Sequence, residues 1–150
     1  MIEIVPYECV GRVKFGMTIE EVATVVGEPE RVSTNRRKER DERRGKMGIR
    51  FSAEDSKVVE VSLRHLEVTL MGIDVFNDPN AFDRLIAVDG KPFESLGFVV
   101  LMKLGITLTG FHDQDESQKA VTAFARGRWD DVKEEFRPLA ELRELRSLVD

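Results

Sequence analysis

One sequence pattern occurs twice in this chain of 150 residues, and the duplication constrains the fold more than any other feature. Residues 11–29 read GRVKFGMTIEEVATVVGEP, and residues 72–92 read GIDVFNDPNAFDRLIAVDGKP. Each copy has a glycine, a short apolar strand that ends in Phe15 or Phe76, a short helical stretch and a final Gly-x-Pro. A gapped similarity of this kind indicates two structural repeats that share one core.

The first copy carries the signals that start and stop a helix. Thr18 and Glu21 have the spacing of a capping box, in which a hydroxyl and a carboxylate each accept a hydrogen bond from a backbone amide at the helix start. Gly27 ends the helix, and Pro29 prevents its continuation. We therefore expect a short helix between Thr18 and Gly27.

The second copy begins its helix with different residues. We expect the cap at Asn77 or Asp78, with Pro79 just inside the helix, where its missing amide hydrogen costs nothing. Gly90 then ends this helix.

Alternation of apolar and polar residues marks strands around these helices. Val59, Val61 and Leu63 alternate with polar residues, as in a strand that has one face on a core. Further strands are predicted at residues 98–101, 106–108 and 121–124. The sequence thus predicts an α+β fold, in which an antiparallel sheet is built from two tandem helix-plus-hairpin repeats.

The length of the chain fits a single domain. We expect repeat one at about residues 1–66, repeat two at about 67–128 and a C-terminal helical tail at about 129–150. In the tail, apolar residues recur every three or four positions, as on one face of an amphipathic helix, and Pro138 is expected to divide it into two short helices. These apolar positions are Val132, Phe136, Leu139, Leu142 and Leu145.

Charge is distributed unevenly along the chain, whose formal net charge is −5. Residues 35–46 read NRRKERDERRGK and carry +4, which leaves −9 for the remainder. Acids interrupt the basic segment from Arg36 to Lys46, and it contains no aromatic residue for stacking on bases. We therefore expect a solvated loop or hairpin tip there, and an acidic body that repels nucleic acid.

Three sequence features predict the cellular location of the protein. No apolar run approaches the ~20 residues of a membrane helix. The first residues, MIEIVPYECVG, lack the basic start of a signal peptide. Cys9 is the one cysteine, so it forms no internal disulfide and no thiolate metal site. We expect a cytoplasmic protein that does not bind membranes.

No motif of a common catalytic class occurs, whether a P-loop, a dinucleotide fingerprint, a nucleophile elbow or a zinc-protease signature. Nothing in the sequence places Cys9 beside His65 or His112 as a thiol–imidazole pair. Residues 112–116 have oxygen-bearing side chains at alternating positions, but they lack the glycine and the distant glutamate of a calcium loop. We predict a protein that is not an enzyme and has no cofactor and no metal site.

Acidic residues at two turns are the candidate binding residues. Asp113, Asp115 and Glu116 lie at one hairpin tip, and Glu54 and Asp55 lie at the matching tip of the first copy. Such carboxylates would steer a basic protein partner toward the chain. The alternative is that they are ordinary solvating charges of turns.

Residues 15–29, FGMTIEEVATVVGEP, resemble a set of small bacterial proteins with the motif F/L-G-M-T/S-x-x-E-V-x-x-x-x-G-x-P. The set includes β-lactamase-inhibitor-like tandem folds, outer-membrane assembly lipoproteins and cytoplasmic proteins, some of them toxin-immunity proteins. The resemblance is good over residues 11–29 and covers about half of the chain in all. It implies a fold and a binding habit, with Phe15 and Val22 in the core, and no catalytic residue. The chain departs from the lipoproteins in having no lipobox.

Together these features predict a non-enzymatic protein-binding protein of the immunity or inhibitor type, which occludes a basic toxin or enzyme. The alternative is a structural or assembly protein that forms a homodimer through its C-terminal amphipathic helix. The sequence does not identify the partner.

Overall fold

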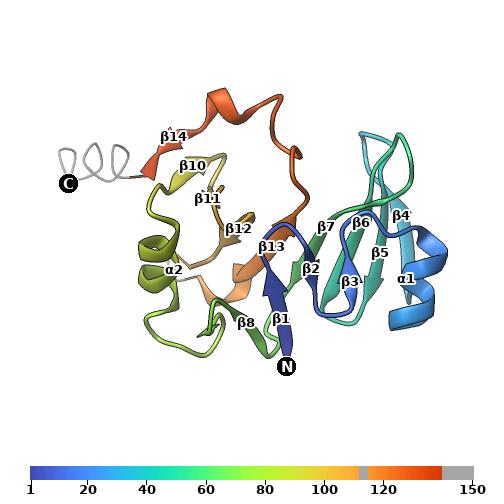
Figure 1. Ribbon diagram of the computed structural model, residues 1–150, viewed down its shortest axis with the longest axis horizontal. Coiled ribbons are helices and arrows are strands. Elements are labelled where there is room, and N and C mark those ends of the chain that lie inside the picture. The colour runs from blue at the N-terminus through green and yellow to red at the C-terminus, as the bar shows by residue number, and fades with distance from the viewer. Residues whose placement is uncertain (112–114, 140–150) are drawn as a thin grey trace.

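The computed structural model describes residues 1–111 and 115–139 and shows two β-sheets packed against each other (Figure 1). The described residues form 14 strands but only two α-helices, so this part of the chain is mostly β. The predicted α+β fold class is therefore wrong. Gly27 and Gly90 end both helices after about two turns, and strand residues outnumber helical residues in the rest of the described chain.

The small sheet has the strand order β3-β2-β1-β8-β9. β1 and β8 are parallel, whereas the other neighbours are antiparallel. Its strands are β1 (Ile2–Val5), β2 (Cys9–Val10), β3 (Val13–Lys14), β8 (Val68–Leu70) and β9 (Ile73–Asp74). The parallel pair thus joins the first strand of the chain to a strand from its middle.

The large sheet has the strand order β14-β10-β11-β12-β13-β7-β6-β5-β4, and all its neighbours are antiparallel. Its first four strands along the chain are β4 (Arg31–Thr34), β5 (Arg40–Arg44), β6 (Met47–Phe51) and β7 (Val58–Leu63). The others are β10 (Phe93–Ser95), β11 (Phe98–Leu101), β12 (Ile106–Thr109), β13 (Ala120–Phe124) and β14 (Arg137–Pro138).

The predicted tandem arrangement is wrong as well, because each half of the chain supplies strands to both sheets. The small sheet combines β1, β2 and β3 with β8 and β9. The large sheet combines four strands of the first half, β4 through β7, with five strands of the second half, β10 through β14. Pairing between β7 and β13 connects the two groups in the large sheet. The boundary predicted near residue 66 falls in the link between β7 and β8.

The first predicted helix is confirmed as α1 (Ile19–Val26). Thr18 Oγ1 accepts a hydrogen bond from the Glu21 amide at 3.2 Å, and Glu21 Oε1 accepts one from the Thr18 amide at 3.1 Å, as in a capping box. Gly27 follows with φ 85°, in the region that favours glycine. The N-terminal boundary and the stop signal of this helix were therefore readable from local sequence.

The second helix, α2 (Ala81–Asp89), begins later than predicted. Asn80 is its N-cap and makes no side-chain cap hydrogen bond. Asp78 instead accepts a hydrogen bond from the Asn80 amide at 2.8 Å, which turns the chain before the helix and leaves Pro79 outside it. Within the described ranges, no helix is long and apolar enough to cross a membrane.

The core lies between the two sheets and under the helices. Val22 of α1 and Leu85 of α2 are fully buried. Val61 and Leu63 are buried as predicted, but Val58 takes the inward position expected for Val59. A register shift between β6 and β7 places Phe51 opposite Val58 and Arg50 opposite Glu60, so Val59 is the extra residue of a bulge.

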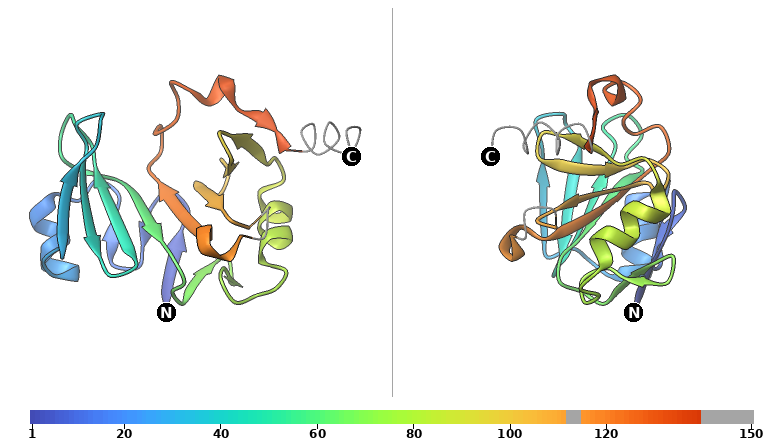
Figure 2. Two further views of the ribbon diagram at one scale, coloured as in Figure 1. Left: turned by 180° about the vertical axis from the view of Figure 1, so that it is seen from behind. Right: turned by 90° about the vertical axis from the view of Figure 1, so that its left-hand side faces the viewer.

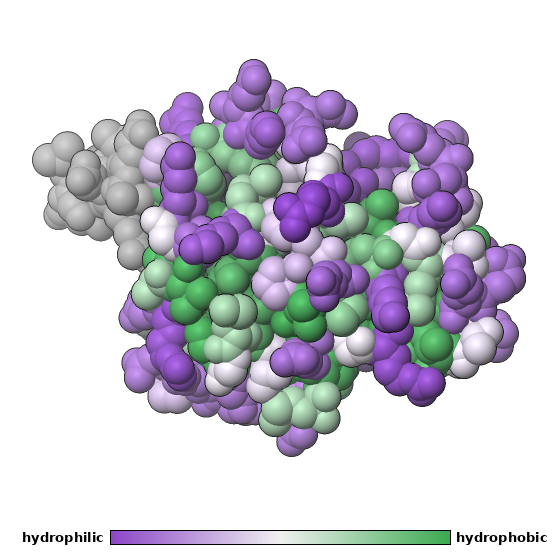
Figure 3. Space-filling model, in the orientation of Figure 1, coloured by the Kyte–Doolittle hydropathy of each residue, from purple (hydrophilic) through white to green (hydrophobic). Residues whose placement is uncertain are grey.

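The charged segment is only partly the loop that we predicted. Residues 35–39 form the turn, but Arg40–Arg44 is a strand that is paired on both sides. Glu42, which is 2% exposed, pairs with Arg40 Nε at 2.7 Å and Arg44 Nη1 at 2.8 Å on the core side, so this charged strand can be buried. The turns at the top right of Figure 3 remain hydrophilic.

The predicted helical tail is wrong for residues 129–138. They form turns, a 3-10 turn (Lys133–Glu135) and β14, which pairs with β10. Figure 2 shows this segment as an arch that leaves β13 and returns to the far edge of the large sheet. Packing on the sheet therefore overrides the helical period, and residues 140–150 of the predicted tail lie outside the described residues.

The β7–β13 junction gives a stability test. We expect Leu63→Ala to lower the free energy of unfolding by about 3 kcal/mol, because Leu63 is completely buried and truncation leaves a cavity. Urea denaturation measures the loss, and Val32→Ala on the edge strand β4, where the side chain is 46% exposed, is the control, with an expected change below about 0.5 kcal/mol. Equal losses in both variants would contradict the described core.

Candidate binding groove on the large sheet

The face of the large sheet opposite the core is hollowed into a groove of about 520 Å³. A smaller hollow of about 220 Å³ over β4, β5 and β6 adjoins it and shares Arg43, Arg50 and Ser62 with it. The groove is within the range of about 300–1,000 Å³ that is typical of ligand sites.

One row of directly paired residues crosses eight strands beneath the groove. The row is Arg31, Arg43, Gly48, Ser62, Thr122, Thr107, Val100 and Phe93, from β4, β5, β6, β7, β13, β12, β11 and β10. Residues directly opposite each other in a sheet project from the same face. The row therefore grades from a cationic end, through small polar residues, to an apolar end.

Small side chains at the centre of this row make the sheet concave there. Ser62 and Thr122 lie on neighbouring strands with their hydroxyl oxygens 2.9 Å apart. Gly48 has no side chain, and a Cβ there would lie 3.4 Å from Arg43 Nη2. The Arg43 guanidinium thus lies over Gly48, on the floor of the groove.

A chain of ion pairs borders the groove along the adjacent row. Arg50 pairs through Nε with Asp41 Oδ1 at 2.7 Å and through Nη1 with Glu60 Oε2 at 2.9 Å. Arg128 Nε lies 3.2 Å from Glu60 Oε1, and the same guanidinium donates two hydrogen bonds to Glu39. Glu39 and Glu60 are only 4% and 6% exposed. These buried charges are stable because each has a partner of opposite sign.

The environment of Glu39 strongly favours its charged form. Burial alone would raise the pKa of this carboxyl, but hydrogen bonds from Arg128 and from Asn35 Nδ2, at 2.9 Å, outweigh burial and lower the pKa to about 2. The Asn35 amide also donates to the Glu39 carbonyl across the β4–β5 turn. The ion pairs therefore fix this turn, and with it Arg37 at the edge of the groove.

The arch covers the apolar end of the groove. Trp129 packs on Phe124 with ring centres 6.1 Å apart, and Phe136 packs on Phe93 at 6.4 Å. The Arg128 guanidinium carbon lies 5.0 Å from the centre of the Trp129 ring. Trp129 Nε1 is buried without a hydrogen-bond partner within the described part of the chain.

Apolar residues at the β10–β11 hairpin remain open to solvent beside the arch. Leu96 is 96% exposed and Phe98 is 44% exposed, and both line the groove. Leu96 has φ 51°, in the left-handed region that leucine rarely adopts. A large apolar side chain held exposed in this conformation indicates a contact with another molecule.

Four arginines give the groove its charge. Arg31, Arg37, Arg43 and Arg64 line the two hollows, and none of them has an acidic ion-pair partner among residues 1–111 and 115–139. Arg37 lies 5.9 Å from the Trp129 ring centre. Four acids line the two hollows. Arg50 neutralises Asp41 and Glu60, Arg40 and Arg44 pair with Glu42, and Glu135 lies at the apolar end. The β4–β7 end of the groove therefore attracts anions.

The structure does not bring the two predicted acidic tips together. Glu54 and Asp55 lie in the turn before β7, and Asp115 and Glu116 lie in the turn before β13. Because β7 and β13 are antiparallel, these turns are at opposite ends of the pair. Asp113 lies outside the described residues.

The tip carboxylates also have structural partners. Asp115 Oδ1 accepts a hydrogen bond from the Ser117 amide at 3.1 Å, and Glu116 pairs with Lys119 at 3.3 Å. Hydrogen bonds from Ser52 and from the Lys57 amide lower the pKa of Asp55. These contacts are those of ordinary turns, and the binding role of the tips stays a prediction.

The sequence provided no reason to place Cys9 beside His65 or His112 as a thiol–imidazole pair. Cys9 is half-buried in the small sheet, while His65 Nε2 lies 3.1 Å from the Glu116 carbonyl oxygen near the large sheet. His112 is outside the described residues. Where the structure is described, no three His, Cys, Asp or Glu side chains are grouped to hold a metal ion.

Sequence reasoning missed the groove because it interpreted the basic segment as a loop. The signal was present in the alternation from Arg40 to Arg44, which puts Asp41 and Arg43 on one face of a strand. The pairing of that strand with Gly48 and Ser62 was not readable from local sequence.

Comparison of the chain with protein-family models, with curated proteins and with solved structures found no match. The family resemblance inferred from the motif in residues 15–29 therefore stays a prediction. The functional assignment depends on the geometry of the groove alone.

The ion pairs predict a pH dependence of stability. Glu39 has a pKa of about 2 in the folded chain against an ordinary value of 4.5, so its contribution is complete above pH 4.5 and is lost as the pH falls toward 2. We expect Glu39→Gln to cost about 2 kcal/mol of unfolding free energy at pH 7 and progressively less below pH 4.5. Urea titrations at several pH values measure this, with the exposed Glu54→Gln as control. A constant loss from pH 7 to pH 2.5 would contradict the role of the carboxylate.

Proposed function

We propose that this is a non-enzymatic binding protein, which holds an acidic segment of a protein partner in the groove of the large sheet. The observation that carries the proposal is the row across the sheet, which runs from arginines through hydroxyl groups to an apolar end, beside which Leu96 and Phe98 are open to solvent. Such a surface offers charge, hydrogen bonds and apolar packing along one line. An elongated ligand with acidic and apolar parts matches all three.

A peptide segment fits the centre of the groove better than an aliphatic chain does. Ser62, Thr122 and Thr107 present hydroxyl groups there, and these bind peptide amides and carbonyls but gain nothing from hydrocarbon. The carboxylates that border the groove, Asp41 and Glu60, are held in ion pairs with Arg50.

This proposal keeps the predicted class of function but places the binding site in the groove of the large sheet and not at the acidic hairpin tips. Immunity and inhibitor proteins act by covering part of a partner, and a groove that grips one segment would serve that action. The unpaired arginines favour an acidic segment, whereas the tip carboxylates were predicted to meet a basic one. A cytoplasmic location is part of the proposal. The homodimer alternative needs an amphipathic helix. Residues 129–138 do not form one, and residues 140–150 of the predicted tail lie outside the described residues, so this alternative stays a prediction.

Selection from a displayed library of linear 12-residue peptides tests the proposal. We expect the full chain to enrich sequences that contain both acidic and apolar residues. Ser62→Trp fills the centre of the groove and should weaken binding of the best synthetic peptide at least about tenfold, as measured by calorimetry. Thr69→Trp on the small sheet is the matched control and should leave affinity unchanged. No enrichment, or equal affinity of the chain and Ser62→Trp, would overturn the proposal.

A further inference from the structure

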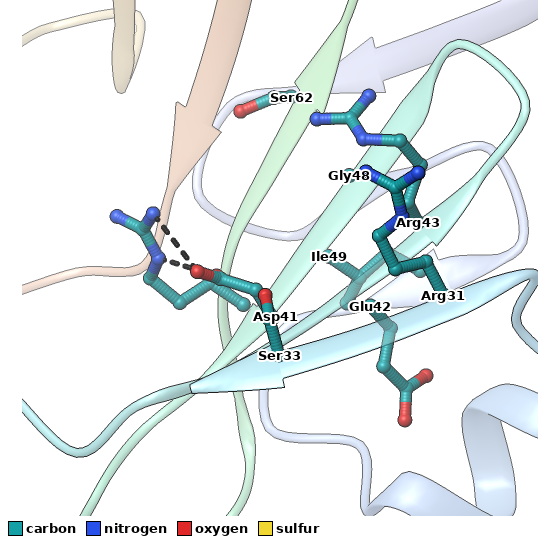
Figure 4. Close-up of a pocket in the computed structure, with 9 residues that line it drawn as sticks. Arg31, Ser33, Asp41, Glu42, Arg43, Gly48, Ile49 and Ser62 are labelled. Atoms are coloured by element: carbon teal, nitrogen blue, oxygen red, sulfur yellow. Dashed lines mark hydrogen bonds and ion pairs between the residues drawn. The ribbon is translucent and has the colours of Figure 1, made fainter. Parts of the chain in front are cut away.

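We infer that Arg31 and Arg43 form a subsite for one carboxylate of the bound segment. The inference rests on the proposed function and specifies where its acidic residue binds. The two arginines lie directly opposite each other on β4 and β5, and both line the same hollow. Figure 4 shows their guanidinium groups on the same side of the sheet.

The pairing of two arginines at this position is unfavourable in the free chain. Like charges that face each other across neighbouring antiparallel strands repel, whereas opposite charges attract. The two acids that line the same hollow do not relieve the repulsion. Asp41 pairs with Arg50, and the Glu42 carboxylate points to the other face, where Arg40 and Arg44 hold it (Figure 4). An anion between Arg31 and Arg43 would turn the repulsion into two attractions.

The local geometry leaves space for that anion. Gly48 provides the floor under Arg43, since it has no side chain. Arg31 is exposed on β4, the edge strand, so a carboxylate can enter from the sheet edge. A guanidinium group presents its donors in a planar fork that matches the two oxygens of a carboxylate.

The position of this subsite also sets a spacing in the ligand. Five strand-to-strand steps separate Arg43 on β5 from Val100 on β11. At about 4.8 Å per step the path is about 24 Å, and an extended peptide advances about 3.3 Å per residue. A recognised segment that lies extended along this path should therefore carry its acid about seven residues from its apolar anchor.

Peptide selection on three forms of the chain tests this inference. The unmodified chain should enrich peptides in which an acidic residue lies about seven positions from an apolar one. Arg31→Gln with Arg43→Gln should keep the apolar preference and lose the acidic one. Arg12→Gln with Lys14→Gln removes the same charge from the small-sheet hairpin and should change nothing. Enrichment of acids by the Arg31/Arg43 variant equal to that of the unmodified chain would overturn the subsite and leave the proposed function standing. Failure of the unmodified chain to enrich any peptide would overturn the function itself.

Affinity measurements with the best selected peptide identify the anion. Replacing its acid by glutamine should weaken binding to the unmodified chain about tenfold, and have no effect on the double variant. Phosphoserine in place of the acid supplies an oxyanion with the same chemistry. Equal or weaker binding of the phosphorylated peptide supports the carboxylate, whereas stronger binding would overturn that assignment.

Thermal unfolding without ligand provides a second measurement. Because Arg31 repels Arg43, Arg31→Gln should raise the unfolding midpoint by about 1–3 °C at low salt, and less at high salt. The exposed Arg12→Gln is the control. A lower midpoint for Arg31→Gln than for the unmodified chain would show that Arg31 makes a stabilising contact within the chain, and would contradict the inference.

Discussion

Antiparallel pairing of β7 with β13 is the interaction on which the large sheet depends. It joins the four strands before residue 66 to the five strands of the second half, and no other contact between strands of this sheet connects the two groups. Leu63 and Val121 face each other in this pair and are buried on the core side. Ser62 and Thr122 face each other on the opposite side and share a hydrogen bond. One strand pair thus supplies both part of the core and the centre of the groove.

The two faces of the large sheet follow different physical requirements. The inner face is apolar because it excludes water between the sheets. The outer face is shaped by small residues at the centre and by charged pairs along one side, where Arg128 reaches from the segment after β13 to Glu39 and Glu60. These buried ion pairs tie the β4–β5 turn to the arch. Arg37, which lies on this turn, is therefore held at the edge of the groove by charges that are themselves neutralised.

Local sequence predicted some elements well, and the reason is visible in each case. The capping box at Thr18 and Glu21 uses only atoms within one helical turn, so its prediction needed no tertiary information. The predicted N-cap of α2 was wrong because Asp78 accepts a hydrogen bond from the Asn80 amide and so closes a separate turn before the helix. Val59 was predicted to face the core, but a bulge opposite Arg50 gave that place to Val58. A bulge depends on the partner strand, which the local pattern does not contain.

The sequence by itself determined where α1 starts, where both helices stop, which short segments prefer to be strands, and that the charge lies unevenly along the chain. Tertiary structure alone decided the rest. It placed Arg31 opposite Arg43, turned Glu42 toward the core and laid Trp129 over the sheet in an arch instead of a helix. These features depend on register between strands distant in the sequence. Register is set by how two faces pack, and neither strand encodes that packing alone.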